Sequence, residues 1–305
     1  MSEIPSIVER DYDLARLTTV RTGGQADFFA RPETGESVVE LLAWAGGAKL
    51  AVGVIGSGSN LLVADSGFQG LIIKLDGQLT QTTISAEQVF CGGGARLPRV
   101  AAQTAEAGLA GLEFGVNIPG TVGGAIRMNA NAYGGELAAV LEWAEVACAG
   151  GLERRTAEQF EFSYRHSNIA GNQVVTSAQF KLAAGDPQAI KTKLADLRDR
   201  RKAAQPGGIK TFGSTFKNPD DPRAENRTAG QLLEAADCKG LEVGGARFSP
   251  KHANFVENFA NATTADVVAL ISEGRDRVRR LTGITLETEV QVLGDVDGAL
   301  WGGGR

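Results

Sequence analysis

Glycine is the residue type that most constrains how this chain can fold. The 305 residues include 40 glycines, about twice the share of roughly 7 % that is usual in proteins. They do not recur at every third position as in collagen, and gather instead in short loops beside apolar segments. Glycine allows positive φ angles and a close approach of the backbone to another group. The sequence therefore predicts a globular protein whose tight turns can lie against a ligand.

The first of these loops, residues 56–61, follows an apolar segment of strand character at residues 50–55. It lacks the Gly-Lys-Ser/Thr ending of a P-loop, and a leucine stands where the dinucleotide fingerprint G-x-G-x-x-G has its third glycine. Its backbone N–H groups and serine hydroxyls can still hold a phosphate. A plain tight turn explains the same pattern equally well. The residues concerned are Gly56, Ser57, Gly58, Ser59, Asn60 and Leu61.

The second loop, residues 118–125, is also rich in small side chains, which would let a flat ring or a diphosphate touch the backbone. The simpler alternative is a packed turn beside a helix. Two such loops about sixty residues apart favour one extended ligand, such as a dinucleotide, over two coincidental turns. The candidate contacts are Pro119, Gly120, Thr121, Gly123, Gly124 and Ala125.

Composition excludes several classes of partner. A net charge of -5 and a pI near 5.3 argue against general nucleic-acid binding, which needs clustered cations. Three cysteines without C-x-x-C spacing and two histidines are too few for a zinc cluster, so we expect neither a metal nor disulfides. Without an apolar segment of about 18 residues, we expect a cytoplasmic protein that has no membrane association, and a monomer is our default.

Apolar periodicity predicts an α+β protein. Helices are expected at residues 36–44, 99–107, 187–204 and 228–236, and a longer one begins with the capping box Thr263-x-x-Asp266. Strands are expected at residues 50–55, 71–75, 88–91, 143–148 and 284–293. The apolar face of the longer helix would consist of Val267, Leu270, Ile271, Val278 and Leu281.

Polar residues in three places could carry chemistry. Arg165, beside Tyr164, could hold a carboxylate with its guanidinium, although an isolated arginine is more often a surface charge. Ser214 lies in a polar loop at residues 213–219, here called the serine loop, which has no G-x-S-x-G pattern of a hydrolase. Glu289 could be a general acid on the last strand, or could point to solvent. His252 is more simply a structural histidine than a catalyst.

Taken in order, the motifs resemble one family along residues 15–293. They are Thr18–Gly24, Gly56–Asn60, Ile118–Ala125, Tyr164-Arg165, Gly213–Pro219 and Leu286–Val290. Several motifs that agree in order and spacing are far more specific than any single loop. The chain is similar to the UDP-N-acetylenolpyruvoylglucosamine reductases. Because Arg165 is soon followed by Val174, it resembles the shorter subtype that lacks a tyrosine-bearing loop.

The resemblance implies three domains. Residues 1–75 and 76–188 would form an FAD-binding pair of the vanillyl-alcohol oxidase (PCMH) type, residues 189–298 an α+β substrate-binding domain, and residues 299–305 a tail. The first and second loops would wrap the FAD diphosphate and flavin. Residues 22–24 and 130–133 are further contributors that the resemblance suggests.

The resemblance also implies a reaction. NADPH would reduce the flavin, and hydride would pass from flavin N5 to C3 of the enolpyruvyl ether of UDP-N-acetylglucosamine enolpyruvate. The product, UDP-N-acetylmuramate, is a peptidoglycan precursor. Arg165 would polarise the carboxylate, Glu289 would support the enolate, and Ser214 would donate the proton to C2. Substrate contacts would come from Tyr164, Lys217 and Asn218.

Two alternatives remain open on the sequence alone. One is another flavin oxidoreductase of the same fold, acting on an alcohol or sugar, which would explain the glycine loops but not Ser214 and Glu289 together. The other is a nonenzymatic nucleotide-sugar binding protein. The choice between NADPH and NADH, a role for a monovalent cation, the oligomeric state and the residues that hold the uridine diphosphate also stay undecided.

Overall fold

The computed structural model describes residues 3–296, and their contacts divide them into two compact units. Unit 1 consists of residues up to 11 together with 27–57 and 69–201, and unit 2 consists of 12–26, 58–68 and the residues from 202 onward. The chain thus passes between the units several times. The three-domain division expected above stays a prediction, and its tail, residues 299–305, lies outside the described residues.

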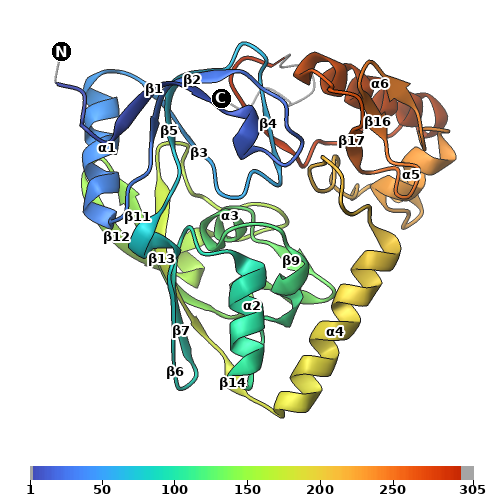
Figure 1. Cartoon of the computed structure of the whole chain (residues 1–305). Coiled ribbons are helices and arrows are strands. Elements are labelled where there is room, and N and C mark those ends of the chain that lie inside the picture. The colour runs from blue at the N-terminus through green and yellow to red at the C-terminus, as the bar shows by residue number, and fades with distance from the viewer. Residues whose placement is uncertain (1–2, 297–305) are drawn as a thin grey trace. The chain divides into compact units, whose positions relative to one another are not determined.

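Five of the six helices in the described residues, all but α3, begin and end close to where the sequence predicts (Figure 1). Side-chain caps mark two of the starts: the Thr34 side chain accepts a hydrogen bond from the Ser37 N–H, and Thr263 and Asp266 form the expected capping box. The helices are α1 Gly35–Gly47, α2 Leu97–Glu106, α3 Val122–Arg127, α4 Pro187–Ala204, α5 Ala229–Ala235 and α6 Thr264–Thr282.

Two larger sheets organise the first two hundred residues. A four-stranded sheet has the order β1 (Val8–Asp13), β2 (Gln25–Ala30), β5 (Phe68–Ile73) and β3 (Ala51–Val54), and β3 runs parallel to β5. A five-stranded antiparallel sheet has the order β12 (Gly151–Thr156), β11 (Leu141–Cys148), β13 (Val174–Lys181), β7 (Gln88–Gly92) and β6 (Thr82–Ser85).

The other strands are short. A three-stranded sheet contains β15 (Glu242–Val243), β16 (Ala246–Phe248) and β17 (Val256–Asn258). Three pairs are β9 (Asn131–Ala132) with β10 (Gly135–Glu136), β8 (Leu109–Ala110) with β14 (Ala183–Ala184), and β4 (Leu61–Val63) with β18 (Gln291–Leu293). The last pair is parallel and joins segments from opposite ends of the sequence.

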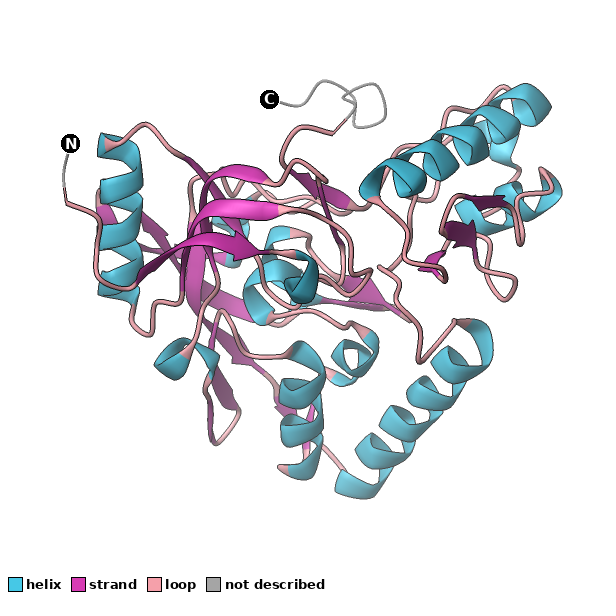
Figure 2. Ribbon diagram, turned by 45° about the horizontal axis from the view of Figure 1, so that its top comes forward, coloured by secondary structure: helices cyan, strands magenta, loops and turns pink. Residues whose placement is uncertain are grey.

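The core of unit 1 lies on both sides of the five-stranded sheet. Figure 2 colours the helices cyan and the strands magenta. One face packs against α2 and α3, where Val100 and Ile126 meet Phe180 of β13. Leu41 and Leu42 of α1 belong to a second cluster, which includes Ala147 of β11. β13 lies at the centre of the sheet and is buried along most of its length, so successive side chains supply apolar groups to both faces.

The core of unit 2 forms where α5 and α6 pack against β16 and β17 (Figure 1). Four of the five residues predicted for the apolar face of α6, Val267, Leu270, Ile271 and Val278, are buried there. The prediction for Leu281 is wrong, because this side chain is 58 % exposed in the last turn of the helix.

The strand predicted at residues 284–293 is wrong in its length. Only Gln291–Leu293 forms a strand, because only these residues pair with a partner strand, β4. The preceding residues keep the predicted alternation of burial, since Ile284, Leu286 and Val290 pack into the unit 2 core. Their backbone makes one isolated antiparallel bridge, between Thr288 and Phe216. The alternation of apolar residues therefore predicted correctly which side chains are buried, but it did not predict which residues pair with another strand.

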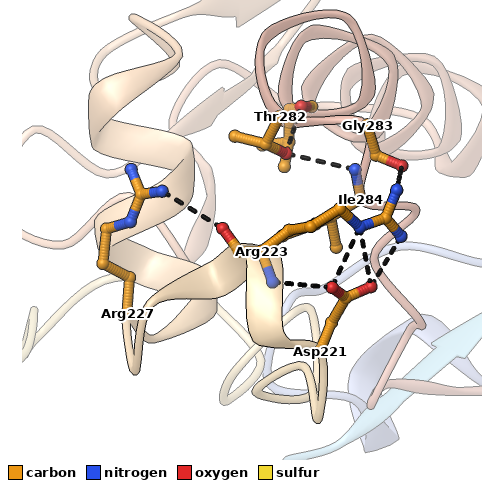
Figure 3. Close-up of polar contacts among 7 residues, drawn as sticks. Asp221, Arg223, Arg227, Thr282, Gly283 and Ile284 are labelled. Carbon is orange, nitrogen blue, oxygen red and sulfur yellow. Dashed lines mark hydrogen bonds and ion pairs between the residues drawn. The ribbon is translucent and has the colours of Figure 1, made fainter.

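The segment that leads to Glu289 is anchored where it leaves α6 (Figure 3). Gly283 ends the helix with a φ of 74°, and its carbonyl accepts a hydrogen bond of 3.0 Å from Arg223 Nη1. The same guanidinium forms a two-pronged ion pair with Asp221, with bonds of 2.9 and 2.6 Å. Hydrogen bonding to Arg223 lowers the pKa of Asp221 to about 2, so this anchor is charged at neutral pH.

None of the helices in the described part of the chain has the length and apolar character needed to cross a membrane.

Candidate active site

The carbonyl oxygens of the first loop are turned toward the protein. Gly56 O accepts a bond of 2.6 Å from Lys74 Nζ in unit 1. In unit 2, Gly58 O, Ser59 O and Asn60 O accept bonds of 3.0, 2.9 and 3.1 Å from the N–H groups of Thr19, Gly213 and Gln291. A loop whose carbonyls are held in this way presents its N–H groups on its other side, which suits a phosphate.

Close packing explains why glycine stands at two of these positions. A Cβ at Gly56 would lie 2.4 Å from Thr121 Oγ1 of the second loop. Gly58 has a φ of +64°, and a Cβ there would lie 2.0 Å from Leu17 O. Both positions exclude a side chain, so the loop backbone stays bare. The residues present therefore fit the diphosphate of a dinucleotide such as FAD.

The second loop is held by the residues around it. Thr121 forms an antiparallel bridge with Arg96, and its side chain accepts a bond from Gly124 N at the start of α3. Gly123 N donates a bond of 2.7 Å to Gly93 O. A Cβ built at Gly120 meets no atom of the described residues within 4 Å. The loop is therefore packed at Thr121 and Gly123 and has free space at Gly120.

Asn254 holds the serine loop in place. Its side-chain oxygen accepts a bond of 2.9 Å from Phe216 N, and its side-chain nitrogen donates one of 2.9 Å to Phe216 O. Its backbone carbonyl accepts from Thr215 N at 2.8 Å. Because Asn254 is itself buried, these three bonds fix the backbone directly after Ser214.

Glu289 lies beside this loop. Its N–H donates a bond of 2.8 Å to Thr215 O, and its carbonyl accepts one of 3.2 Å from Asn60 Nδ2. Gly213 N in turn donates to Ser59 O of the first loop. Hydrogen bonds within unit 2 therefore connect three of the predicted elements: the first loop, the serine loop and the segment that contains Glu289. None of these connections is visible in local sequence pattern.

Arg165 stands at the tip of a tight turn in unit 1, between Ser163 and His166, which pair with each other. It has a φ of 57°, and its guanidinium carbon lies 5.2 Å from the centre of the Tyr164 ring, which is 47 % exposed. Arg165 Nη1 donates a bond of 2.9 Å to Asn131 Oδ1. The side-chain amide of Asn131 thus orients the positively charged guanidinium of Arg165. Residues 167–173 then lead directly to β13.

The two predicted substrate contacts of the serine loop have partners in unit 2. Lys217 Nζ lies 3.4 Å from Glu287 Oε2, and the Glu287 side chain is 76 % exposed. A pair this open contributes little stability, so Lys217 can exchange it for a phosphate. Asn218 Oδ1 accepts a bond of 3.0 Å from Ala229 N at the start of α5. Its amide NH2 is therefore the group that can contact a ligand without loss of this bond.

His252 occupies a structural position. Its Nδ1 accepts a bond of 3.2 Å from Asn254 N, and its ring meets Phe255 edge-on with 4.9 Å between ring centres. Burial lowers the pKa of His252, so the neutral ring that can accept this bond is favoured. The ring therefore supports Asn254, which holds the serine loop.

Three residues of this arrangement received no individual role from the sequence: Lys74, Asn131 and Asn254. Asn131 lies within residues 130–133, which the resemblance suggested as contributors to the FAD site and not as partners of Arg165. Local pattern gave no signal for the contacts of these three residues, because their partners lie 18 or more residues away in the sequence.

Among the residues that the structure describes, no group of three or more His, Cys, Asp or Glu side chains could hold a metal ion.

Comparison with family models gives two matches. The FAD binding domain matches residues 26–157, and the C-terminal domain of UDP-N-acetylenolpyruvoylglucosamine reductase matches residues 205–293. The FAD-binding match contains both glycine loops, and the C-terminal match contains the serine loop and Glu289.

Individual proteins agree over nearly the whole length. The UDP-N-acetylenolpyruvoylglucosamine reductase of Levilactobacillus brevis is 42 % identical over 289 residues, which cover 94 % of this chain and 93 % of that protein. That of Granulibacter bethesdensis is 40 % identical over 281 residues, 92 % of this chain and 89 % of the relative. The crystal structure of the Thermus caldophilus enzyme is similar with a TM-score of 0.81 and 34 % identity, covering 94 % of this chain and 99 % of that one.

Proposed function

This chain belongs to the UDP-N-acetylenolpyruvoylglucosamine reductase family, and we infer from that membership what it catalyses. It is an FAD-dependent oxidoreductase that uses NADPH to reduce UDP-N-acetylenolpyruvoylglucosamine to UDP-N-acetylmuramate, a step of peptidoglycan synthesis. The fold, an FAD-binding domain of the PCMH type joined to a family-specific C-terminal domain, agrees with the expectation from the sequence.

The residues that hold FAD belong to the two glycine loops. The first loop has its carbonyls bound by the protein, which leaves N–H groups for the diphosphate. The second loop keeps an open side at Gly120 for the flavin. When bound between these loops, FAD would supply the hydride chemistry by which NADPH reduces the enolpyruvyl group at C3.

Ser214 is proposed as the proton donor to C2 of the substrate. Hydride addition at C3 leaves negative charge at C2 and the adjacent carboxylate, so a positioned acid is needed there. A serine hydroxyl is a weak acid, and its position must therefore be rigid. The bonds from Asn254 to Thr215 and Phe216 supply that rigidity. Lys217 and Asn218, on the same loop, are proposed contacts for the substrate's carboxylate or diphosphate.

Glu289 and Arg165 are proposed to stabilise the enolate-like charge. Glu289 is held beside the serine loop by its backbone bond to Thr215. A protonated or hydrogen-bonded carboxyl there would support charge that develops during hydride addition. Arg165 would hold the substrate carboxylate with its planar guanidinium, oriented by Asn131 and flanked by Tyr164.

One observation carries the residue assignments: hydrogen bonds within unit 2 join the first loop, the serine loop and the Glu289 segment. The first loop bonds to Gly213, which directly precedes Ser214, and to the backbone carbonyl of Glu289, so it holds the segments of both proposed proton-handling residues next to the proposed cofactor loop. A nonenzymatic nucleotide-sugar binder would need no such connection. An oxidase acting on an alcohol would have no use for Ser214 and Glu289 together.

The test follows the flavin band near roughly 450 nm under anaerobic conditions, because the cofactor reports both half-reactions. NADPH should bleach the purified protein, and enolpyruvyl-UDP-N-acetylglucosamine should restore the colour. Bleaching that this substrate cannot reverse would contradict the proposed substrate. Absence of a flavin band even after FAD is added would contradict the cofactor assignment.

The same protein should behave as a cytoplasmic monomer that binds only small molecules, which gel filtration and fractionation would check.

A further inference from the structure

Lys74 is a half-buried lysine that bonds to the first loop. It lies directly after the end of β5, and its Nζ donates a bond of 2.6 Å to Gly56 O. The neighbouring pairing of β3 with β5 fixes its place, since Ile55 N donates to Ile73 O at 3.0 Å. Lys74 is therefore aimed at the loop by the sheet itself and not by a flexible connection.

Lys74 differs from the other partners of the loop. The carbonyls of Gly58, Ser59 and Asn60 accept from neutral backbone N–H groups. Gly56 O accepts instead from an ammonium group. Removal of an ammonium group from water is unfavourable, and a neutral donor would satisfy a carbonyl equally well. The charge at this position therefore calls for a further explanation.

Further charges lie around Lys74. Burial and the charges of Arg31 and Arg96 lower the pKa of Lys74, while Asp76 raises it. Arg96 is also the bridge partner of Thr121, and Thr121 lies directly against Gly56. Lys74 and Arg96 thus lie beside the place where Gly56 of the first loop meets the second loop, and both charges would attract an anion bound there.

We propose that Lys74 is a positioning residue for the FAD diphosphate, which holds Gly56 O toward the sheet and balances the negative charge of the bound cofactor. This inference rests on the assignment of the two loops to FAD. It has a consequence that a purely structural lysine would not have. The diphosphate favours the charged form of Lys74, so FAD binding and protonation of Lys74 strengthen each other.

The experiment measures the dissociation constant of FAD for apoprotein by flavin fluorescence, with Lys74→Met, Lys74→Arg and the wild type. Lys74→Met should weaken FAD binding by about 10- to 100-fold, the effect of one charged hydrogen bond. Lys74→Arg should recover most of this loss, because it keeps a charge and N–H donors. Lys191→Met, at an exposed position of α4, is the matched control and should bind like the wild type.

The pH profile gives the second readout. As the pH rises toward the ordinary lysine pKa of about 10.4, wild-type affinity should fall, because Lys74 has a lowered pKa and loses its proton. The affinity of Lys74→Arg should stay nearly constant, because arginine keeps its charge. Equal affinity of Lys74→Met and wild type, or equal profiles of wild type and Lys74→Arg, would overturn the proposal. If Lys74→Met does not fold, the wild-type and Lys74→Arg profiles decide alone. A wild type that binds no FAD would instead contradict the proposed function.

Discussion

The side-chain nitrogen of Asn60 donates a hydrogen bond of 3.2 Å to the backbone carbonyl of Glu289, and the backbone carbonyl of Asn60 accepts one of 3.1 Å from the Gln291 N–H. One residue of the first loop is thus bound to both sides of Val290. Asn60→Ala should weaken FAD binding and also slow reoxidation of the flavin by substrate, each by up to about tenfold, the effect of one hydrogen bond.

Stopped-flow absorbance and FAD titration would measure both effects of Asn60→Ala. Thr80→Ala is a suitable control, since Thr80 Oγ1 also donates to a backbone carbonyl, that of Gly77, at an exposed position of unit 1 that is not a proposed site residue. A variant that loses FAD affinity but reoxidises at the normal rate would separate Asn60 from Glu289.

Ser214→Ala tests the proton donor. Reduction of the flavin by NADPH should stay nearly normal, because that half-reaction needs no proton at C2 of the substrate. Reoxidation by enolpyruvyl-UDP-N-acetylglucosamine should slow by about 10²- to 10⁴-fold, the usual contribution of general acid catalysis. Anaerobic single-turnover measurements would resolve the two halves. A similar loss in both would remove Ser214 from its proposed role.

Asn131→Ala tests whether the amide orients Arg165. Loss of the 2.9 Å bond should lower kcat/KM for the enolpyruvyl substrate by about 10- to 100-fold, since the bond involves a charged group. Arg165→Ala should lower it further. In the Arg165→Ala background, Asn131→Ala should have almost no additional effect, because the two residues act through one contact. Additive losses in the double variant would show that Asn131 acts independently.

His252 predicts a pH dependence of stability. Burial places its folded-state pKa below the value of about 6.5 in an unfolded chain. The unfolded state therefore binds more protons in the interval between the two values, and stability falls as the pH drops from about 6.5 through that interval. Urea unfolding of the wild type and His252→Gln should show a difference in stability that shrinks at lower pH. A difference that stays constant with pH would contradict a lowered pKa of His252 in the folded state.

Two glycine-to-alanine substitutions should change the stability of the fold in opposite directions. Gly283→Ala should destabilise the protein by about 1 kcal/mol or more, because its φ of 74° disfavours a side chain and a Cβ would lie 3.0 Å from Arg223 Nη1. Gly46→Ala should stabilise it by about 0.4–1 kcal/mol, since this glycine lies within α1 and a Cβ meets no described atom within 4 Å. Urea denaturation measures both. Equal signs would show that backbone conformation does not control these positions.

Local features of the sequence determined much of the fold. The helix expected at residues 187–204 is α4, and the capping box at Thr263 starts α6 as predicted. These features can be read from the sequence because the capping bonds and apolar periodicity of a helix lie within a few residues. The order of the glycine loops and polar motifs likewise determined the family, since it depends on residue identity along the chain alone.

Only the tertiary structure decided which residues meet. The parallel pairing of β18 with β4 joins residues 291–293 to 61–63, and the bridge between Phe216 and Thr288 brings Glu289 to the serine loop. It also decided that Asn131 orients Arg165 and that Lys74 binds Gly56. Such contacts join residues far apart in sequence, and their hydrogen bonds leave no periodic trace in either segment. Local pattern therefore located the candidate residues, while nonlocal backbone pairing assembled them.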